Sequence, residues 1–396
     1  MPARGLILLL CLIGAANTVS IGAFPALLPE LGAAGALADW QLGVVAGVFG
    51  LARMVANVPA GLFMTYHLSR ALLVAPAFVL TGALLMVGGG SFAAFLIGRA
   101  VMGVGHTLTT LGGLTVVLRY RAGASLASSL NAMEFSAMLG VLGGAGLLSV
   151  LPRTVPWHAA LLLACAPVAL SLALLPALLR ALPLRARDEP RPLFARAESG
   201  AGAERPLLVT FRRGHLAVLA VVAGAAVAVS YASVEQFVIP LRGSREFGLD
   251  RVGIARLLML SQVVDAAALL PLGALADRRG TPVVLGSVLL VFSLALGLIG
   301  FGGLPLMVVG CALFGFSMAS WMLPLGILRA ATPPAQVAWR TALYRVSVDG
   351  GMFLGPFLSG LLGARHAGVL PGVMATVLAT VGLALLGAAR LTGRSR

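Results

Sequence analysis

Residues 273–282 read Gly273-Ala-Leu-Ala-Asp-Arg-Arg-Gly-Thr-Pro282, a short charged stretch between two long apolar runs. One run ends near Ala276 and the next begins at Val283, which leaves room only for a tight turn. Gly273 and Gly280 let the backbone turn and neighbouring helices approach without a Cβ in the way. Asp277 stands beside Arg278 and Arg279, where a carboxylate can meet a helix N-terminus and an arginine together. The stretch therefore predicts a turn between two membrane helices.

The composition of the chain indicates that lipid is its solvent. Of its 396 residues, 59% are hydrophobic and 10% are charged, with a mean hydropathy of +1.01. Soluble proteins average about 45–50% apolar and about 25% charged residues. A soluble fold of this size could not bury so much apolar surface, whereas a polytopic helical membrane protein can leave it in lipid.

The arginine positions explain the net charge of +15. All 28 basic residues are arginines, and most of them fall on one side of the predicted membrane. This asymmetry predicts that both termini are cytoplasmic, in a bacterial inner membrane, and it argues against a nucleic-acid partner. The exceptions are five arginines on the other side, Arg153, Arg242, Arg245, Arg251 and Arg365, and three within helices, Arg53, Arg99 and Arg256.

The apolar runs predict twelve transmembrane helices in two sets of six. Residues 1–180 form the first bundle and residues 215–396 the second. Residues 181–214, which are rich in charge and proline, are predicted to be a flexible cytoplasmic linker. The expected helices are 5–29, 41–65, 70–89, 92–118, 127–151, 157–180, 215–241, 252–276, 282–302, 304–330, 342–363 and 368–390.

The two sets of helices repeat one another. Residues 61–70 stand 212 positions before the opening stretch, and other residue pairs keep nearly the same offset. Such offsets across four helices are hard to obtain by chance. The pairs are Pro59 with Pro271, Arg53 with Asp265, Gly103 with Gly315, Glu134 with Asp349, and Gly140 with Gly355.

The motif Gly-x-Leu-x-Asp-Arg-x-Gly at 273–280 resembles the signature loop of the major facilitator superfamily, the twelve-helix secondary transporters. Arg99-x-x-x-Gly-x-Gly105 resembles a second pattern of that family, in which the arginine is linked to proton transfer. The resemblance covers nearly the whole chain. It implies an all-α polytopic membrane fold of two pseudo-symmetric six-helix bundles.

The first copy of the signature departs from the family pattern. Thr65, Tyr66 and Leu68 stand where the family has Asp, Arg and Gly. In the family this loop helps to hold one state by touching the other half. The departure implies that this contact is weaker here or is carried by Asp277 alone.

Ionisable residues at bilayer depth are functional candidates, because each costs at least about 2.5–3.5 kcal/mol on insertion scales. The resemblance implies that the helices of Asp265 and Arg53 line one cavity, and we expect the two side chains to face each other across it. A static ion pair that holds the bundle is the alternative. Arg99 could favour the ionised form of a nearby carboxylate or hydrogen-bond to carbonyl oxygens. The candidates for substrate binding or proton coupling are Asn17, Arg53, Arg99, Glu134, Glu235, Gln262 and Asp265.

A second group of residues is predicted to gate the cytoplasmic mouth. Arg345 lies four residues before Asp349, so the pair can close on one helix face. Charged side chains that only reach the interface are the alternative. With the residues of the signature turn, the gating set is Gly273, Asp277, Arg278, Gly280, Arg345 and Asp349.

The motifs that are absent narrow the function. There is no Walker loop, His-Glu-x-x-His or Cys-x-x-Cys, so we expect no enzyme activity, no cofactor and no metal. The resemblance to the drug:proton antiporter branch predicts a monomeric secondary transporter for a small organic solute, with protons and the lipid bilayer as partners. Proton-coupled efflux is the first prediction. Uptake by symport, or a receptor or assembly subunit that moves nothing, are the alternatives.

Overall fold

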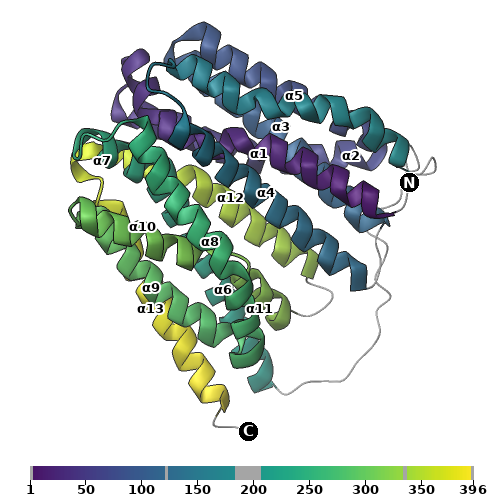
Figure 1. The fold of residues 1–396 in the computed structure, drawn as a ribbon. Helices are drawn as coiled ribbons and strands as arrows, with labels where there is room; N and C mark the ends of the chain where they lie inside the picture. The colour runs from purple at the N-terminus through teal and green to yellow at the C-terminus, as the bar shows by residue number, and fades with distance from the viewer. Residues whose placement is uncertain (1–2, 121–123, 183–206, 333–336, 394–396) are drawn as a thin grey trace. The chain divides into compact units, whose positions relative to one another are not determined.

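The structure is a computed structural model that describes residues 3–120, 124–182, 207–332 and 337–393. The described residues are almost entirely helical, and none of them forms a strand (Figure 1). Contacts within the chain define two compact units. Unit 1 contains residues 1–193 and 240–259, and unit 2 contains residues 194–239 and 260–396.

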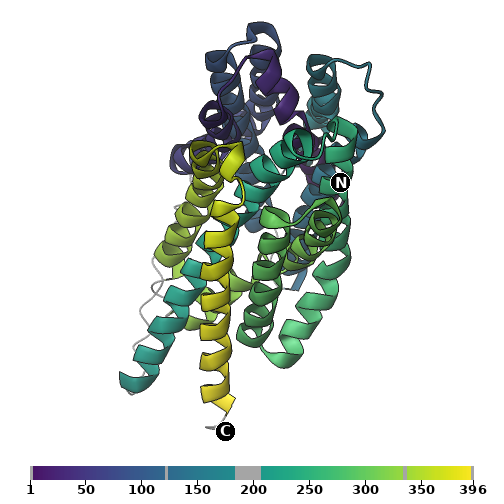
Figure 2. The same ribbon diagram turned by 90° about the vertical axis from the view of Figure 1, so that its left-hand side faces the viewer.

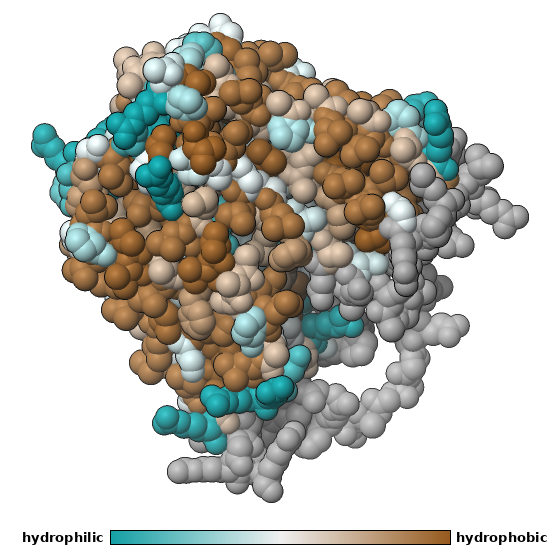
Figure 3. Space-filling model, in the orientation of Figure 1, coloured by the Kyte–Doolittle hydropathy of each residue, from teal (hydrophilic) through white to brown (hydrophobic). Residues whose placement is uncertain are grey.

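Most of the helices can cross a membrane. Ten segments of the described residues are long and apolar enough to do so. Helix α2 (Asp39–Gly89) counts once among them, but its 51 residues correspond to two predicted helices, 41–65 and 70–89. Apolar side chains dominate the visible surface (Figure 3), as expected for helices that face lipid. The fold is that of an all-α polytopic membrane protein, while the count of twelve helices stays a prediction.

Unit 1 is built mainly from five helices of the first half of the chain. Helix α1 packs on α4 and α5, and α2 packs on α3. Residues 240–259, which include most of α7 and the first part of α8, complete the unit. The helices are α1 (Ala3–Ala34), α2, α3 (Phe92–Tyr120), α4 (Ala124–Val150), α5 (Trp157–Ala181) and α7 (Ile239–Arg245).

Unit 2 repeats this construction. Helix α12 packs on α6, and α9 packs on α10 and α13. Figure 2 shows α13 and α6 side by side. The helices are α6 (Leu207–Ser233), a π-helical turn (Val234–Val238), α8 (Arg251–Arg279) beyond residue 259, α9 (Thr281–Phe301), α10 (Leu304–Met318), α11 (Leu323–Ala331), α12 (Val337–Leu362), a 3-10 turn (Ala364–His366) and α13 (Val369–Gly393).

The two signature copies fold differently, and one residue pair explains why. In the second copy, Gly280 has φ +90° and separates α8 from α9. Its counterpart in the first copy is Leu68, and a leucine rarely adopts positive φ because of its Cβ. There the chain stays helical apart from His67, whose dihedral angles are −134° and 45°. The expected loop at 61–70 is therefore reduced to a kink inside α2.

The packing of two equivalent glycines confirms the internal repeat. A Cβ on Gly103 of α3 would lie 2.8 Å from the carbonyl oxygen of Phe49 on α2. A Cβ on Gly315 of α10 would overlap the carbonyl oxygen of Ser261 on α8. Both the glycines and the carbonyls are separated by 212 positions. Residues that are 212 positions apart in the sequence therefore make the same close helix contact in each unit.

Several predicted boundaries differ from the structure. Helix α1 continues to Ala34, beyond the expected end at residue 29. Helix α6 begins at Leu207, so the last part of the expected linker 181–214 is helical. Residues 183–206 of that linker lie outside the described residues. The expected helix 304–330 is interrupted at 319–322, between α10 and α11.

Candidate functional site

Unit 2 contains a buried acid at an irregular point of its helix. Glu235 is 3% exposed and lies in the π-helical turn between α6 and α7. The Tyr231 hydroxyl donates a hydrogen bond of 2.9 Å to Glu235 Oε1. Turns of the π type are rare and are frequent at functional sites. A carboxyl group that is removed from water here can exchange a proton or meet a polar ligand.

A break in the neighbouring helix lies beside this acid. Residues 319–322 separate α10 from α11, and here Trp321 N–H donates to the carbonyl of Met318, three residues back. Pro324 explains the break, because it lacks an N–H and its ring would clash with the carbonyl of residue 320 in a continuous helix. The Trp321 ring lies 5.7 Å from the Tyr231 ring, edge to face. Interrupted helices at membrane depth are tolerated where they line a cavity or a site.

Aromatic and amide side chains complete this group, which we call the Glu235 cluster. The Tyr231 ring stacks with that of Phe314 at 6.3 Å. Gln262 of α8 lies close enough to the Glu235 carboxyl to act on it, yet among the described residues its amide atoms make no hydrogen bond of good geometry. Buried amides without partners are costly, which is typical of sites that accept a ligand. The cluster consists of Tyr231, Glu235, Gln262, Phe314 and Trp321.

Unit 1 contains a buried cationic side chain. Arg99 of α3 is 1% exposed. Its guanidinium carbon lies 3.7 Å from the ring centre of Phe24 on α1 and 4.4 Å from that of Phe49 on α2. Its Nε and Nη1 atoms have no hydrogen-bond partner among the described residues. Arg99 is therefore held by rings rather than by a carboxylate.

Two further basic side chains surround Phe49. The guanidinium carbon of Arg53 lies 6.0 Å from the Phe49 ring centre, and the His106 ring lies 5.5 Å from it. His106 interacts electrostatically with both arginines. We call Phe24, Phe49, Arg99 and His106 the Arg99 cluster. It brings Arg99 and His106 of α3 against aromatic rings of α1 and α2 in the interior of unit 1.

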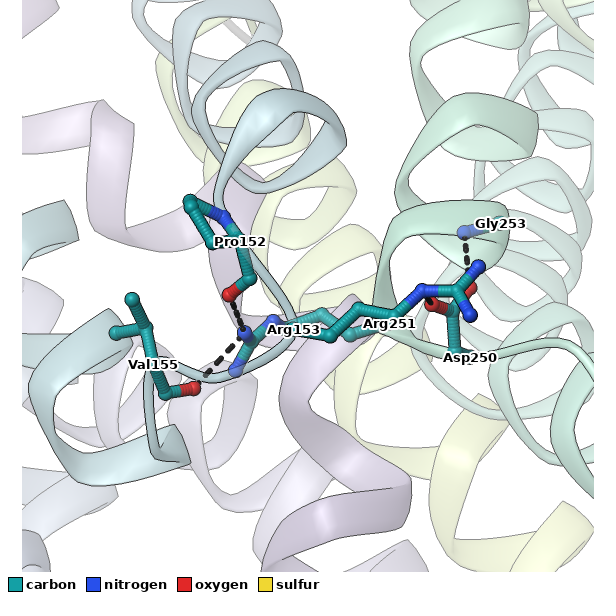
Figure 4. Close-up of polar contacts among 6 residues, drawn as sticks. All are labelled: Pro152, Arg153, Val155, Asp250, Arg251 and Gly253. Atoms are coloured by element: carbon teal, nitrogen blue, oxygen red, sulfur yellow. Dashed lines mark hydrogen bonds and ion pairs between the residues drawn. The ribbon is translucent and has the colours of Figure 1, made fainter.

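A third polar group lies where residues 240–259 meet the ends of α1 and α4 in unit 1. The Arg251 guanidinium is 3.0 Å from Glu30 Oε2 and donates to the carbonyl oxygens of Pro152 and Val155 at 3.1 and 2.9 Å. Arg153 forms an ion pair with Asp250 in return, and the two arginine side chains run past each other (Figure 4). We call Glu30, Arg153, Asp250 and Arg251 the rim cluster.

The structure also fixes the surroundings of other predicted coupling residues. Asn17 is 1% exposed and donates to the Ile13 carbonyl and to Ser171 Oγ. Asp265 is half-buried and lies in unit 2, whereas Arg53 lies in unit 1, so their pairing stays a prediction. Glu134 is exposed on α4.

The predicted gating residues are mostly exposed. Asp277, Arg278 and Gly280 lie at the exposed end of α8, and a Cβ on Gly273 would meet nothing within 4 Å. Arg345 is exposed, whereas Asp349 is 2% exposed. Their gating role stays a prediction.

Sequence reasoning missed the partners of these charged residues. Tyr231 and Trp321 carry a signal, because they are polar aromatic residues inside apolar runs. Phe24 and Phe49 carry none, because a phenylalanine in a membrane helix is expected everywhere. Glu30 follows Pro29 at the end of an apolar run, and only the fold shows that it meets Arg251.

The fold and these clusters define a class of protein: a multi-pass helical membrane protein with ionisable groups buried in two repeated units. Residues 6–253 match the Major Facilitator Superfamily, and the chain belongs to this family. Membership places it among transporters rather than enzymes.

Solved structures share the fold at low sequence identity. A mutant of the peptide transporter POT has a TM-score of 0.79 at 14% identity, covering 99% of this chain and 95% of that chain. The nucleoside transporter NupG has a TM-score of 0.71 at 14% identity, covering 97% and 98%. The human organic anion transporter MFSD10 (TETRAN) has a TM-score of 0.64 at 19% identity, covering 97% and 100%. No curated protein matches this sequence.

Proposed function

We propose that this protein moves a small organic solute across the bacterial inner membrane by alternating access, and that the proton gradient drives its efflux. The observation that carries the proposal is Glu235, an acid that is 3% exposed and hydrogen-bonded to Tyr231 beside a helix break. Proton-coupled uptake is the second candidate, since the same acid could serve either direction.

Glu235 is the proposed proton carrier. A carboxyl group can gain or lose a proton, and the free energy of each form depends on what surrounds it. A movement of α11 that carries Trp321 away from Tyr231 would change those surroundings. Proton exchange and helix movement would then be coupled. Asp265, half-buried on α8, is the second candidate for this role.

The arginine asymmetry supports the proposed orientation, with both termini in the cytoplasm. The rim cluster would then lie on the periplasmic side, and its ion pairs would close that end in one state. The two bundles, 1–180 and 215–396, would rock about a central site as a monomer. Asp277, Arg278, Arg345 and Asp349 would act at the opposite end.

A two-stage experiment tests the function. A strain that overproduces the protein is first grown against a panel of toxic and nutrient solutes. A resistance shift indicates export, and growth on a new nutrient indicates import. The purified protein is then placed in proteoliposomes with the solute identified, and a pH step is imposed. Flux in response to the step supports proton coupling, whereas a receptor or assembly subunit would give none.

Variants separate the two proposed proton carriers. Glu235→Gln is expected to abolish flux driven by the pH step while solute exchange without a gradient persists, because the glutamine keeps the shape but cannot titrate. Asp265→Asn should leave gradient-driven flux in place if Glu235 is the carrier. Glu246→Gln, which removes a half-exposed carboxylate outside the spans, is the matched control. Equal loss of both activities in Glu235→Gln would contradict a coupling role.

A further inference from the structure

Arg99 carries a charge that the described part of unit 1 does not neutralise. A buried carboxylic acid can become neutral by taking up a proton, but a guanidinium stays charged in proteins. The contacts to Phe24 and Phe49 recover part of the cost of removing this charge from water. Two ring contacts recover less than the desolvation of a full charge costs. The site therefore favours an anion that the described residues of unit 1 do not supply.

The described carboxylates of unit 1 either form ion pairs with other arginines or are exposed. Among its described residues, four carboxylates form ion pairs with arginines that do not include Arg99. The fifth, Glu134, is exposed on α4. The four paired acids are Glu30, Asp39, Glu246 and Asp250, with Arg251, Arg245, Arg242 and Arg153 respectively.

In the Arg99 cluster, the buried nitrogen atoms without partners lie on two side chains of α3, Arg99 and His106. Among the described residues, Nε and Nη1 of Arg99 have no acceptor. Nδ1 of His106, seven residues or about two turns further along α3, has no partner there either. A guanidinium offers parallel N–H donors that match the two oxygens of a carboxylate. Arg53 adds a second positive charge close to His106. Charge and hydrogen-bonding geometry thus both fit a small anion.

We propose that Arg99 receives the carboxylate of a small organic anion, so that the transported solute is a monocarboxylate. This inference rests on the proposed function, because it names the substrate class of the same transporter. The rings of Phe24 and Phe49 hold the guanidinium in place, and His106 lies against the same Phe49 ring. Arg99 is 1% exposed here, so the anion enters in a state that uncovers it.

Binding to the purified full-length protein tests this directly. The probes are benzoate, 3-phenylpropionate and 4-phenylbutyrate, each with its neutral amide and its amine of matching length. Thermal unfolding is followed with a thiol-reactive dye, because Cys165 and Cys311 are buried and react only when the chain opens. At least one carboxylate is expected to raise the apparent Tm, while the matching amide and amine do not. The absence of any carboxylate effect, or an equal effect of the amines, overturns the proposal.

Two variants separate binding from structure. Arg99→Met should lose the carboxylate shift, yet its ligand-free Tm should equal or exceed that of the parent, because an unpaired buried charge is gone. Arg99→Lys keeps the positive charge but lacks the parallel N–H donors of the guanidinium, so it should weaken carboxylate binding about 10-fold. Arg245→Gln, which removes an exposed arginine, is the control and should bind like the parent. A carboxylate shift that survives in Arg99→Met overturns the proposal.

Failure of the anion-site proposal can be distinguished from failure of the proposed transport function. If the protein binds carboxylates but shows no flux after a pH step, the anion site is supported and proton-coupled transport is contradicted. If the protein moves a neutral or cationic solute and binds no carboxylate, transport is supported and the anion site is contradicted.

Discussion

Arg251 allows a quantitative test of the rim cluster. The change Arg251→Gln removes the contacts to Glu30, Pro152 and Val155 and leaves the Glu30 carboxylate without its partner. Breaking a buried ion pair costs about 3–5 kcal/mol, and breaking an exposed one about 0–1 kcal/mol. The Arg251 side chain is 3% exposed but that of Glu30 is 36% exposed. We therefore expect an intermediate loss of about 2–3 kcal/mol, or about 30–150-fold in an equilibrium constant.

Cysteine labelling can measure the equilibrium between the closed rim cluster and an open state in which residues 240–259 have separated from α4. Ser149 of α4 is 5% exposed, and its Oγ lies 3.8 Å from Met259 Sδ within unit 1. Ser149→Cys, in a protein whose three native cysteines are replaced, should react slowly with a polar maleimide. If residues 240–259 separate from α4 before labelling, the rate follows the open population. Arg251→Gln should then raise the labelling rate by about 30–150-fold.

A second ion pair of unit 1 provides the control. Arg245 lies 2.7 Å from Asp39, and these side chains are 46% and 27% exposed. Such an exposed pair is worth about 0–1 kcal/mol, so Arg245→Gln should change the rate less than about 5-fold. The same small effect in Arg251→Gln would refute the reasoning, because burial would then not distinguish the two pairs.

Two further predictions concern stability. A Cβ on Gly144 would overlap the carbonyl oxygen of Val19, whereas one on Gly143 meets nothing within 4 Å. Gly144→Ala should therefore lose about 1–3 kcal/mol, and Gly143→Ala should be neutral or gain up to about 1 kcal/mol, measured as apparent Tm. A hydrogen bond from Arg242 holds the pKa of Glu246 below its ordinary value. This pair stabilises the protein above the unfolded-state pKa and is lost as the pH falls, so Arg242→Gln should show a shallower loss of Tm between about pH 5 and pH 3.

The repeat shows how far sequence alone could reach. The offset of 212 positions between Gly103 and Gly315 follows from the sequence, and the structure places both glycines against equivalent carbonyls. This worked because close helix packing requires the smallest residue at a fixed position. The signature stretch 273–280 likewise predicted the turn that Gly280 makes at positive φ. Where Leu68 stands in place of the glycine, the chain has a kink within α2 and not the loop that the motif predicts.

The partners of the buried charges could not be predicted from the sequence. The sequence identifies Arg99 and Glu235 as candidates, because any ionisable residue in an apolar run is costly. It does not show that Arg99 lies against Phe24 and Phe49, or that Trp321 lies against Tyr231, the hydrogen-bond partner of Glu235. Phe24, Phe49 and Trp321 come from other helices, and an apolar run has no pattern that specifies which helix face meets which.

The sequence by itself determined that this chain is a helical membrane protein with an internal repeat, because hydropathy and small-residue spacing act locally along the chain. Only the tertiary structure decided the partners of the ionisable side chains. It gave Arg251 the carboxylate of Glu30 and gave Arg99 none among the described residues. The physical reason is that neutralising a charge depends on distances of a few ångströms between helices, and these are set by packing rather than by sequence spacing.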